Sequence, residues 1–260
     1  MGAIEERGVE TAKVEVRHLH ALAEYEACIE LQKRVWGGAE IDLVPLPIFV
    51  VAAEVGGQVL GAYAGEEIVG FTLAVPGVRD GRPFLHSHMT AVIPELQNRG
   101  IGRMLKLKQR EDALERGIEL VEWTFDPLEI RNAWFNIERL GAIVRRFLPN
   151  CYGVTSSPLH AGLPTDRVVA EWWLRSPRVE GILRGTTARA ADPRIRITVP
   201  KAIVEWRRTN PSEAARVQTR IREEFQSWFG RNFAVTGFEV TAEGGSYLLE
   251  PYEGAKSLSA

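Results

Sequence analysis

Apolar residues in the first part of the chain recur with two periods, and this pattern predicts strands alternating with helices. Residues 13–19 alternate between apolar and polar side chains, as in a half-buried strand, whereas Leu22, Tyr25 and Ile29 fall at helical spacings. The elements expected up to the first hairpin are a strand at 13–19, helices at 22–36 and 48–54, and strands at 58–65 and 67–78.

The middle of the chain is organised around residues 86–117, which predict a buried strand, a short loop and a helix. Residues 149–166 have little periodicity and several turn formers, so we expect a long loop there. The other elements expected after residue 117 are a strand at 119–126, a short helix at 132–140, and strands at 142–148 and 167–174.

The composition changes beyond residue 174. Residues 175–194 are rich in Arg, Gly and Pro, which favours a surface linker or loop. The remaining expected elements are a strand at 194–199, helices at 201–208 and from Pro211 onwards, and strands at 233–241 and 246–252. We therefore expect a core over residues 1–175 and a C-terminal α/β extension over residues 176–260. The extension is expected to pack on the core, because so short a segment buries little surface alone.

Charge and composition narrow the class of protein. The formal net charge of −2 gives no basic surface, so nucleic acid is not an expected partner. No apolar run approaches the roughly 20 residues that span a bilayer, and the acidic residues 1–10 are unlike a signal peptide. We expect a cytoplasmic protein that does not bind membranes. Cys28 and Cys151 are expected to be reduced thiols, and no metal site is predicted.

The hexapeptide QNRGIG, residues 97–102, lies where the predicted central helix begins. The first turn of a helix has backbone N–H groups without partners and a partial positive charge from the helix dipole. Gly100 and Gly102 leave room for an anion to approach these amides. Arg99 and Arg103 add formal charge at the same place. The pattern favours a phosphate site, although glycines in a turn before a helix also occur without one.

Residues 92–102, VIPELQNRGIG, resemble the acyl-CoA-binding motif of the GNAT (Gcn5-related N-acetyltransferase) superfamily. That motif is a strand ending in V-x-P, followed by Q/R-x-x-G-x-G/A at the start of a helix. The order of predicted elements, and Asn132 followed by Leu140-Gly141, also match the family, so the resemblance covers about residues 13–175. It implies an α/β (α+β) GNAT fold, in which helices flank a mixed central sheet with a parallel, splayed strand pair.

The resemblance also implies how a cofactor binds. In the family, the strands that correspond to residues 88–92 and 121–124 run parallel and then splay, and the pantetheine arm pairs in the gap. A backbone N–H in the splay would stabilise the oxyanion that forms from the thioester. The implied co-substrate is acetyl-CoA or another acyl-CoA. The implied cofactor-binding residues are Ala91, Val92, Ile93, Gln97, Asn98, Arg99, Gly100, Ile101, Gly102 and Arg103, with Asn132 and Phe135 beside the arm.

A closer resemblance rests on residues 123–128, WTFDPL, and residues 163–167, LPTDR. These segments look like an uncharacterised GNAT subfamily that is associated with N-acylamino-acid racemases. Some members are proposed to be N-succinyltransferases of amino acids. The resemblance implies an acyl-CoA-dependent N-acyltransferase whose acceptor is the amine of a small metabolite such as an amino acid.

Acyl transfer to an amine requires a group that takes a proton from the ammonium form. The candidates on the predicted central strands are Glu122, Asp126, His86 and His88. Glu122 shares a strand face with Thr124, and Asp126 lies at the end of that strand, near the mouth of the expected splay. Three of the four candidates also have a purely structural alternative. These alternatives are a salt bridge for Glu122, a turn cap for Asp126 and core packing for His88.

The proton donor for the departing thiolate is less clear from the sequence. GNAT enzymes usually carry a Tyr for this step in the helix after the second parallel strand, and that position holds Ile137 here. Tyr152, in the following loop, is an alternative catalytic hydroxyl or a packing residue. A CoA thiolate is also a tolerable leaving group, so a step without an acid stays open.

Arg167 is the candidate clamp for a carboxylate on the acceptor, because a guanidinium group binds carboxylates bidentately. Its structural alternative is a salt bridge with Asp166 or Glu171, and Asp126 is a second candidate acceptor contact. Two hypotheses remain for the whole chain, an N-acyltransferase and a non-catalytic acyl-CoA sensor or scaffold. The extension would complete the acceptor site, form a homodimer or only cover the sheet.

Overall fold

A computed structural model describes residues 14–37, 43–153, 162–186 and 195–252. The acidic opening segment and the middle of the predicted long loop lie outside the described residues. The described elements agree with most of the predicted ones to within a few residues. They are β1 (Val14–His18), α1 (Leu22–Trp36), α2 (Leu46–Glu54), β2 (Gln58–Ala64), β3 (Glu67–Arg79), β4 (Arg82–Val92), η2 (Pro94–Leu96), α3 (Ile101–Glu115), β5 (Leu120–Phe125), α4 (Ile130–Trp134), η3 (Phe135–Arg139), β6 (Ile143–Leu148), β7 (Arg167–Trp173), α5 (Pro177–Leu183), β8 (Ile195–Pro200), α6 (Ile203–Thr209), α7 (Pro211–Phe229), β9 (Phe233–Val240) and β10 (Gly244–Pro251).

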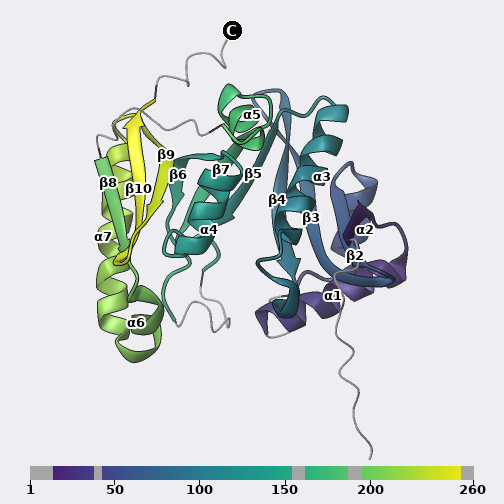
Figure 1. Ribbon diagram of the computed structural model, residues 1–260, viewed down its shortest axis with the longest axis horizontal. Coiled ribbons are helices and arrows are strands. Elements are labelled where there is room, and N and C mark those ends of the chain that lie inside the picture. Colours follow the sequence, from purple (N-terminus) through teal and green to yellow (C-terminus); the bar gives the residue numbers. More distant parts are fainter. Residues whose placement is uncertain (1–13, 38–42, 154–161, 187–194, 253–260) are drawn as a thin grey trace, which may run out of the picture.

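The described strands form one ten-stranded sheet in the order β1-β2-β3-β4-β5-β7-β6-β9-β10-β8 (Figure 1). Neighbouring strands pair antiparallel, except β4 and β5, which pair parallel. The expected mixed sheet with one parallel pair is thereby confirmed. The strands of the extension continue the same sheet, since β9 follows β6, with Val144 opposite Val235.

Helices cover both faces of the first half of the sheet. Phe49 of α2 packs on Phe71 of β3, with ring centroids 5.8 Å apart. The next residue of β3, Thr72, points to the other face and lies 3.5 Å from the hydroxyl of Ser87, which accepts a hydrogen bond from Lys106 of α3. Thus α2 and α3 lie on opposite faces. Within the described residues, no helix is long and apolar enough to cross a membrane.

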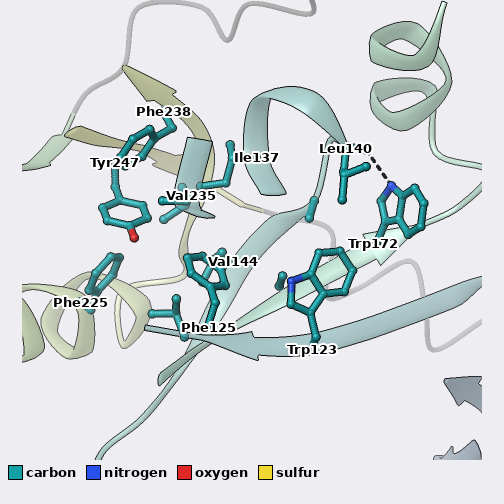
Figure 2. Close-up of a cluster of buried hydrophobic side chains, with 14 of the residues drawn as sticks. Trp123, Phe125, Ile137, Leu140, Val144, Trp172, Phe225, Val235, Phe238 and Tyr247 are labelled. Atoms are coloured by element: carbon teal, nitrogen blue, oxygen red, sulfur yellow. Dashed lines mark hydrogen bonds between the residues drawn. The ribbon is translucent and has the colours of Figure 1, made fainter. Parts of the chain in front are cut away.

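The second half of the sheet shares one apolar core with the extension (Figure 2). Phe125 of β5 and Val144 of β6 belong to the same buried cluster as Phe225 of α7 and Tyr247 of β10. The aromatic rings of Phe225 and Tyr247 meet edge to face at 5.0 Å, a favoured arrangement for buried aromatic pairs. The side chains of α7 therefore pack against strands on both sides of the β6–β9 junction.

Polar contacts tie the extension to the segment that follows β5. Arg207 of α6 forms an ion pair with Asp126 at 2.6 Å and another with Glu129 at 2.6 Å. The buried hydroxyl of Tyr247 donates a hydrogen bond to the carbonyl of Pro127 at 2.7 Å. The extension thus fixes the backbone where β5 turns into α4.

The prediction of a loop over residues 175–194 is wrong for its first part, because α5 occupies Pro177–Leu183. Ser176 caps this helix by accepting a hydrogen bond from the N–H of Val179, and Pro177 fits its first turn. Val179 is fully buried, close to the backbone of Gly141. The N-cap at Ser176 and the burial of Val179 therefore stabilise a helix here, although the composition of the segment resembles that of a linker.

Candidate active site

The parallel strands β4 and β5 pair over a very short distance. Their register contains Leu85 opposite Val121 and His86 opposite Glu122, and β4 then continues beside β3 alone as far as Val92. In Figure 1 the two strands lie close at one end and apart at the other. Beyond His86 and Glu122, the facing backbone edges are left without strand partners, which is the arrangement that an extended ligand can fill.

A β-bulge lies in β4 immediately after this last pair. Ser87 is opposite Ala74 and Met89 is opposite Leu73, so His88 is the extra residue. A bulge bends its strand and redirects a side chain, and bulges are common beside active sites. The rings of His86 and His88 lie 6.3 Å apart. The bulge therefore places two imidazoles together at the point where the strands separate.

The backbone of β4 restricts which amides are open to a ligand. The N–H of Ile93 donates to the carbonyl of Val69 at 2.9 Å, so this amide is engaged within the sheet. Hydrogen-bonded pairs alternate along an antiparallel ladder, so the N–H of Ala91 also faces β3. Of the three predicted amides, that of Val92 faces the gap. The side chain of Gln97 donates to the carbonyl of Val92 at 3.0 Å.

The glycine motif opens α3, as the sequence predicts. Gly100 is the N-cap residue with a φ of +85°, and a side chain there or at Gly102 would meet no atom within 4 Å. The open space and the unpartnered amides of the first helical turn form a site that an anion can approach closely. Asn98 also has a positive φ, of +63°, and its side chain accepts a hydrogen bond from Arg131 of α4.

The other predicted cofactor residues occupy two kinds of environment. Arg99 is exposed, and the guanidinium of Arg103 has a buried Nε without a hydrogen-bond partner. Ile101 is buried in the core and serves to fix the helix start. Asn132 is exposed and accepts a hydrogen bond from Asn136, and Phe135 packs partly buried against the core. Their assignment to CoA stays a prediction.

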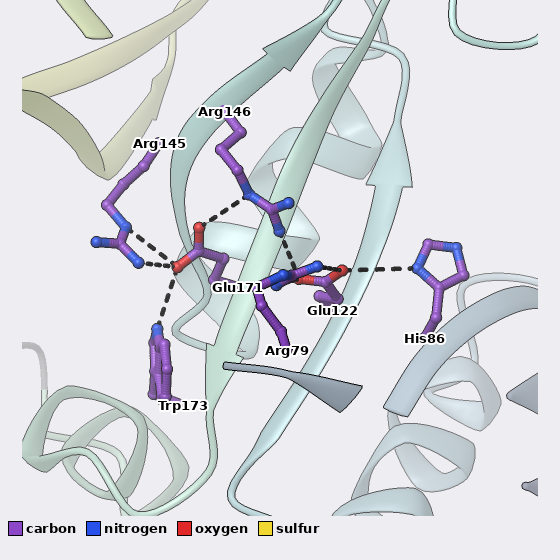
Figure 3. A network of polar contacts seen from close by, with 7 residues as sticks. All are labelled: Arg79, His86, Glu122, Arg145, Arg146, Glu171 and Trp173. Atoms are coloured by element: carbon purple, nitrogen blue, oxygen red, sulfur yellow. Dashed lines mark hydrogen bonds and ion pairs between the residues drawn. The ribbon is translucent and has the colours of Figure 1, made fainter. Parts of the chain in front are cut away.

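A charged network lies across β3, β4, β5, β7 and β6 on the face that carries His86 (Figure 3). Glu122 is only 4% exposed and accepts two hydrogen bonds from Arg79, each of 2.8 Å. It also pairs with Arg146. Burial alone would raise the pKa of Glu122, but the hydrogen bonds and charges of Arg79 and Arg146 outweigh it and hold this pKa below its usual value.

Glu171 of β7 lies directly opposite Glu122, and such a like-charged pair is unfavourable without compensation. Arg145 and Arg146 both reach Glu171. Adjacent strand residues normally point to opposite faces, but a register shift between Val144 and Arg146 leaves Arg145 unpaired in the ladder. Because of this bulge, the side chains of Arg145 and Arg146 both reach the face that carries Glu171. The sequence pattern does not show this network, because it depends on register.

Unlike Glu122, the two histidines of β4 have pKa values that are governed mainly by burial. Burial lowers the pKa of His86, and the charge of Glu122, 4.0 Å away, opposes this shift. Desolvation also lowers the pKa of His88, which keeps an exposed edge. Both rings are therefore neutral near pH 7, the form in which an imidazole accepts a proton.

The remaining predicted site residues lie around the ends of β5 and β7. Asp126 caps a turn by accepting the N–H of Leu128 at 2.8 Å and pairs with Arg207, so both of its oxygens are engaged. The hydroxyl of Tyr152 lies 2.6 Å from that of Thr124, and Arg167 lies over the Tyr152 ring at 5.4 Å. Tyr152 and Arg167 thus share one corner of the site.

The expected salt bridge of Arg167 with Asp166 or Glu171 is not observed among the described side chains. Asp166 instead binds Arg222 of α7 through two hydrogen bonds, and Glu171 binds Arg145 and Arg146. Arg167 donates to the backbone carbonyl of Asp166 at 2.9 Å. In the part of the chain that the structure describes, no group of three His, Cys, Asp or Glu side chains could hold a metal ion.

Ile137, at the position where the family carries a Tyr, is fully buried in the core of the second half of the sheet. Its side chain has no proton to give. The described fold thus places an apolar side chain at this position.

Residues 16–141 match the Acetyltransferase (GNAT) family. No curated protein matches the sequence. Similar solved structures include the ribosomal-protein-S18-alanine N-acetyltransferase from Escherichia coli, with 15% identity over 63% of this chain and 95% of that one and a TM-score of 0.51.

Two further structures have the same fold. The putative acetyltransferase yncA from Salmonella typhimurium, solved with its cofactor acetyl-CoA, has 18% identity over 64% of this chain and 97% of that one, with a TM-score of 0.51. The protein smu.2055 from Streptococcus mutans UA159 has 16% identity over 62% and 99%, with a TM-score of 0.51. Residues 16–141, just under half of the chain, are therefore similar to the acetyltransferase domain of the GNAT family, and the solved structures have the same fold.

Proposed function

We propose that the protein transfers an acetyl group, or a larger acyl group such as succinyl, from CoA to the amine of a small metabolite such as an amino acid. The observation that carries this proposal is the end of the β4–β5 pairing at His86 and Glu122, combined with the glycine-lined start of α3. The first offers backbone edges to an extended arm, and the second offers amides to a pyrophosphate.

Acetyl-CoA is the proposed co-substrate, as in the similar Salmonella structure that was solved with it. Its pyrophosphate would bind the amides of residues 98–103, and its pantetheine arm would follow β4 towards His88. The gap-facing N–H of Val92 supports this path. Asn132 and Phe135 would line the arm from α4 and η3, because both lie in the helical segment after β5.

His88, with His86, is the proposed general base. Both rings are neutral near pH 7 and lie where the strands separate, so either accepts a proton from the acceptor ammonium directly or through one water. Glu122 is less suited to this role because Arg79 and Arg146 stabilise its charged form. Asp126 is less suited because Arg207 and the turn after β5 occupy its oxygens.

The acceptor would lie on the face of β5 that carries Glu122 and Thr124. Arg167 and Tyr152 are the proposed contacts for an acceptor carboxylate, since they sit together at the end of β7 and β5. This corner supports the finer proposal of the racemase-associated subfamily and an amino-acid substrate. The same proposal includes a cytoplasmic location, a possible homodimer and a boundary at residue 175 between the core and the C-terminal extension.

The direct test is release of free CoA thiol from acetyl-CoA and succinyl-CoA with a panel of amines that includes amino acids. Steady, amine-dependent release is the expected result. Binding of CoA by calorimetry without release by any amine would contradict the proposal and leave only an acyl-CoA-binding role.

A variant of the motif tests the cofactor site separately. Gly102→Leu is expected to weaken CoA binding by about 100-fold or more, because a side chain would fill the space that the pyrophosphate needs. Leu improves helix propensity over Gly, so the fold should persist. Lys108→Leu, on the same helix, is the matched control. Unchanged CoA affinity of Gly102→Leu would remove the assigned role of the motif.

A further inference from the structure

Lys106 of α3 is a buried cation at the junction of the two parallel strands. Its Nζ donates to the hydroxyl of Ser87 at 2.7 Å and lies 4.0 Å from the ring centroid of Trp123. Ser87 follows His86, the last paired residue of β4, and Trp123 follows Glu122, the last paired residue of β5. The amine of Lys106 therefore bridges the two strands at the point where they begin to separate.

The surroundings of Lys106 contain no compensating charge. The residue is 4% exposed, and its amine also donates a hydrogen bond to the side-chain oxygen of Gln109 at 3.1 Å. Among the described residues it forms no salt bridge, so burial is unopposed and lowers the pKa of Lys106 to about 7. Such a lysine holds a proton near neutral pH and releases it easily.

The titratable groups near Lys106 lie on other strands or further along α3. His86 of β4 points to the opposite face, yet the positive charge of Lys106 contributes to lowering its pKa. Glu122 of β5 also points away and is held by Arg79. Asp112, on α3 itself, pairs with His18 of β1 and with Arg116.

The path proposed for the cofactor ends beside Lys106. The pyrophosphate site is at the start of α3, and α3 returns along β4. The distance along β4 from Val92 to Ser87 is about 17 Å at the usual rise of a strand, and an extended pantetheine arm runs in this direction. The sulfur would then lie near Ser87 and Trp123, within reach of Lys106, while Ile137 supplies no proton there.

We propose that Lys106 is the general acid of the reaction and gives its proton to the sulfur of the departing CoA. This inference rests on the proposed function, because it assumes that the thioester reacts in the gap between β4 and β5. It goes further by assigning a catalytic role to a residue on the face opposite the acceptor.

The step balances as follows. The amine nitrogen forms a bond to the thioester carbon, the carbon–sulfur bond breaks, and its electron pair stays on sulfur. The ammonium of Lys106 gives a proton to that sulfur and later takes one from water. The acceptor, which enters as an ammonium ion, loses two protons in total, so the products are an amide, a free thiol and one proton.

The first test measures the acidity of the bound thiol and needs no acceptor. The ultraviolet absorbance of the thiolate is followed during a pH titration of the CoA complex, and the same titration with desulfo-CoA is subtracted. Near pH 7, where part of the protein still carries the ammonium form of Lys106, the thiolate fraction of bound CoA is expected to be about fivefold higher in the wild type than in Lys106→Met. Lys108→Met, an exchange of a partly exposed lysine on α3, should behave as wild type.

The second test is kinetic. Lys106→Met is expected to lower kcat by about 100-fold with little change in the KM for acyl-CoA, and to remove the fall of kcat as the lysine deprotonates at high pH. A purely structural lysine would alter stability without removing this limb of the pH profile. If Lys106→Met fails to fold, Lys106→Gln replaces it.

The outcomes separate the two proposals. Equal acidity of the bound thiol in wild type and Lys106→Met, with steady turnover in the wild type, would overturn the role of Lys106 and leave the proposed function intact. If the acidity of the bound thiol depends on Lys106 but no amine causes thiol release, the result would support the position of Lys106 beside the sulfur. The same result would contradict the proposed function.

Discussion

Glu122 and Lys106 are two buried charged residues on opposite faces of the sheet, at the junction of β4 and β5. Each is 4% exposed. Glu122 is surrounded by Arg79 and Arg146, whereas Lys106 contacts a hydroxyl, an amide and an indole. Burial opposes both charges, but only the carboxylate has partners that overcome it. Although the two side chains are equally buried, Glu122 keeps its negative charge, whereas Lys106 releases its proton easily near neutral pH.

The difference assigns distinct tasks to the two faces. The face of Glu122 carries the neutral imidazoles and the arginines, which suit a proton acceptor and an anionic acceptor group. The face of Lys106 is covered by α3, and the proposed thioester site in the gap between β4 and β5 lies beside its amine.

The largest effect is expected for the combined substitution His86→Gln and His88→Gln. Loss of both proposed bases should lower kcat by about 100-fold or more, with unchanged affinity for CoA. Glu122→Gln is the comparison, and its kcat should fall less. A larger fall for Glu122→Gln, in a protein that is still folded under the assay conditions, would make Glu122 the base.

The second prediction concerns the pH dependence of stability. Lys106 has a pKa of about 7 in the folded chain, against roughly 10.4 when unfolded, so between these values the unfolded chain binds the extra proton. The free energy of unfolding should therefore rise with pH in this window, on the order of 1 kcal/mol per pH unit. Urea unfolding of wild type and Lys106→Met measures this, and an identical slope for both would contradict the burial effect.

The third prediction is that Glu122→Gln lowers the free energy of unfolding by about 2 kcal/mol. The expected loss is modest because the side chains of Arg79 and Arg146 are 43% and 38% exposed, so that solvent screens their interaction with Glu122. The pKa of Glu122 is lowered in the folded state, so this stability is present above the unfolded pKa and disappears as pH falls through the folded one.

Denaturant unfolding from neutral to acidic pH should show the difference between Glu122→Gln and wild type shrinking as pH falls. Glu111→Gln, which removes an exposed pair with Lys108, is the matched control and should change stability by less than about 0.5 kcal/mol. An equal effect of both variants would show that the Glu122 network is no more than a surface ion pair.

The smallest effect is expected for Tyr152→Phe. The hydroxyl of Tyr152 contacts Thr124 at 2.6 Å, but the side chain is 47% exposed and lies on the acceptor face. Its loss should cost less than about 1 kcal/mol of stability and change kcat by less than about threefold. A loss of kcat comparable with that of Lys106→Met would identify Tyr152 as the acid instead.

Much of the fold follows from local signals in the sequence. The helices α1 and α3 and the strands up to β7 were predicted close to their observed bounds, because their apolar periods are regular and glycines or prolines mark their ends. The start of α5 was missed although Ser176-Pro177 is a helix-start signal, since the Arg- and Gly-rich composition around it favoured a linker.

The sequence predicts only the parts of the site whose residues are neighbours along the chain. The glycine motif is contiguous, and it was found. The network of Glu122, Glu171 and the arginines depends on two bulges, at His88 and Arg145, and a sequence pattern does not contain strand register. Lys106 was overlooked because a lysine in a helix is usually solvated, and only the packed fold places it on the buried stripe beside Gln109.

The contact between Lys106 and Trp123 allows the protonation of Lys106 to be followed by the fluorescence of the tryptophan. An indole ring 4.0 Å from a titrating charge changes its fluorescence when the proton leaves. The difference in emission between wild type and Trp123→Phe isolates this signal from the other tryptophans. Occupancy and protonation of the gap can thus be followed optically, without a label and during a single turnover.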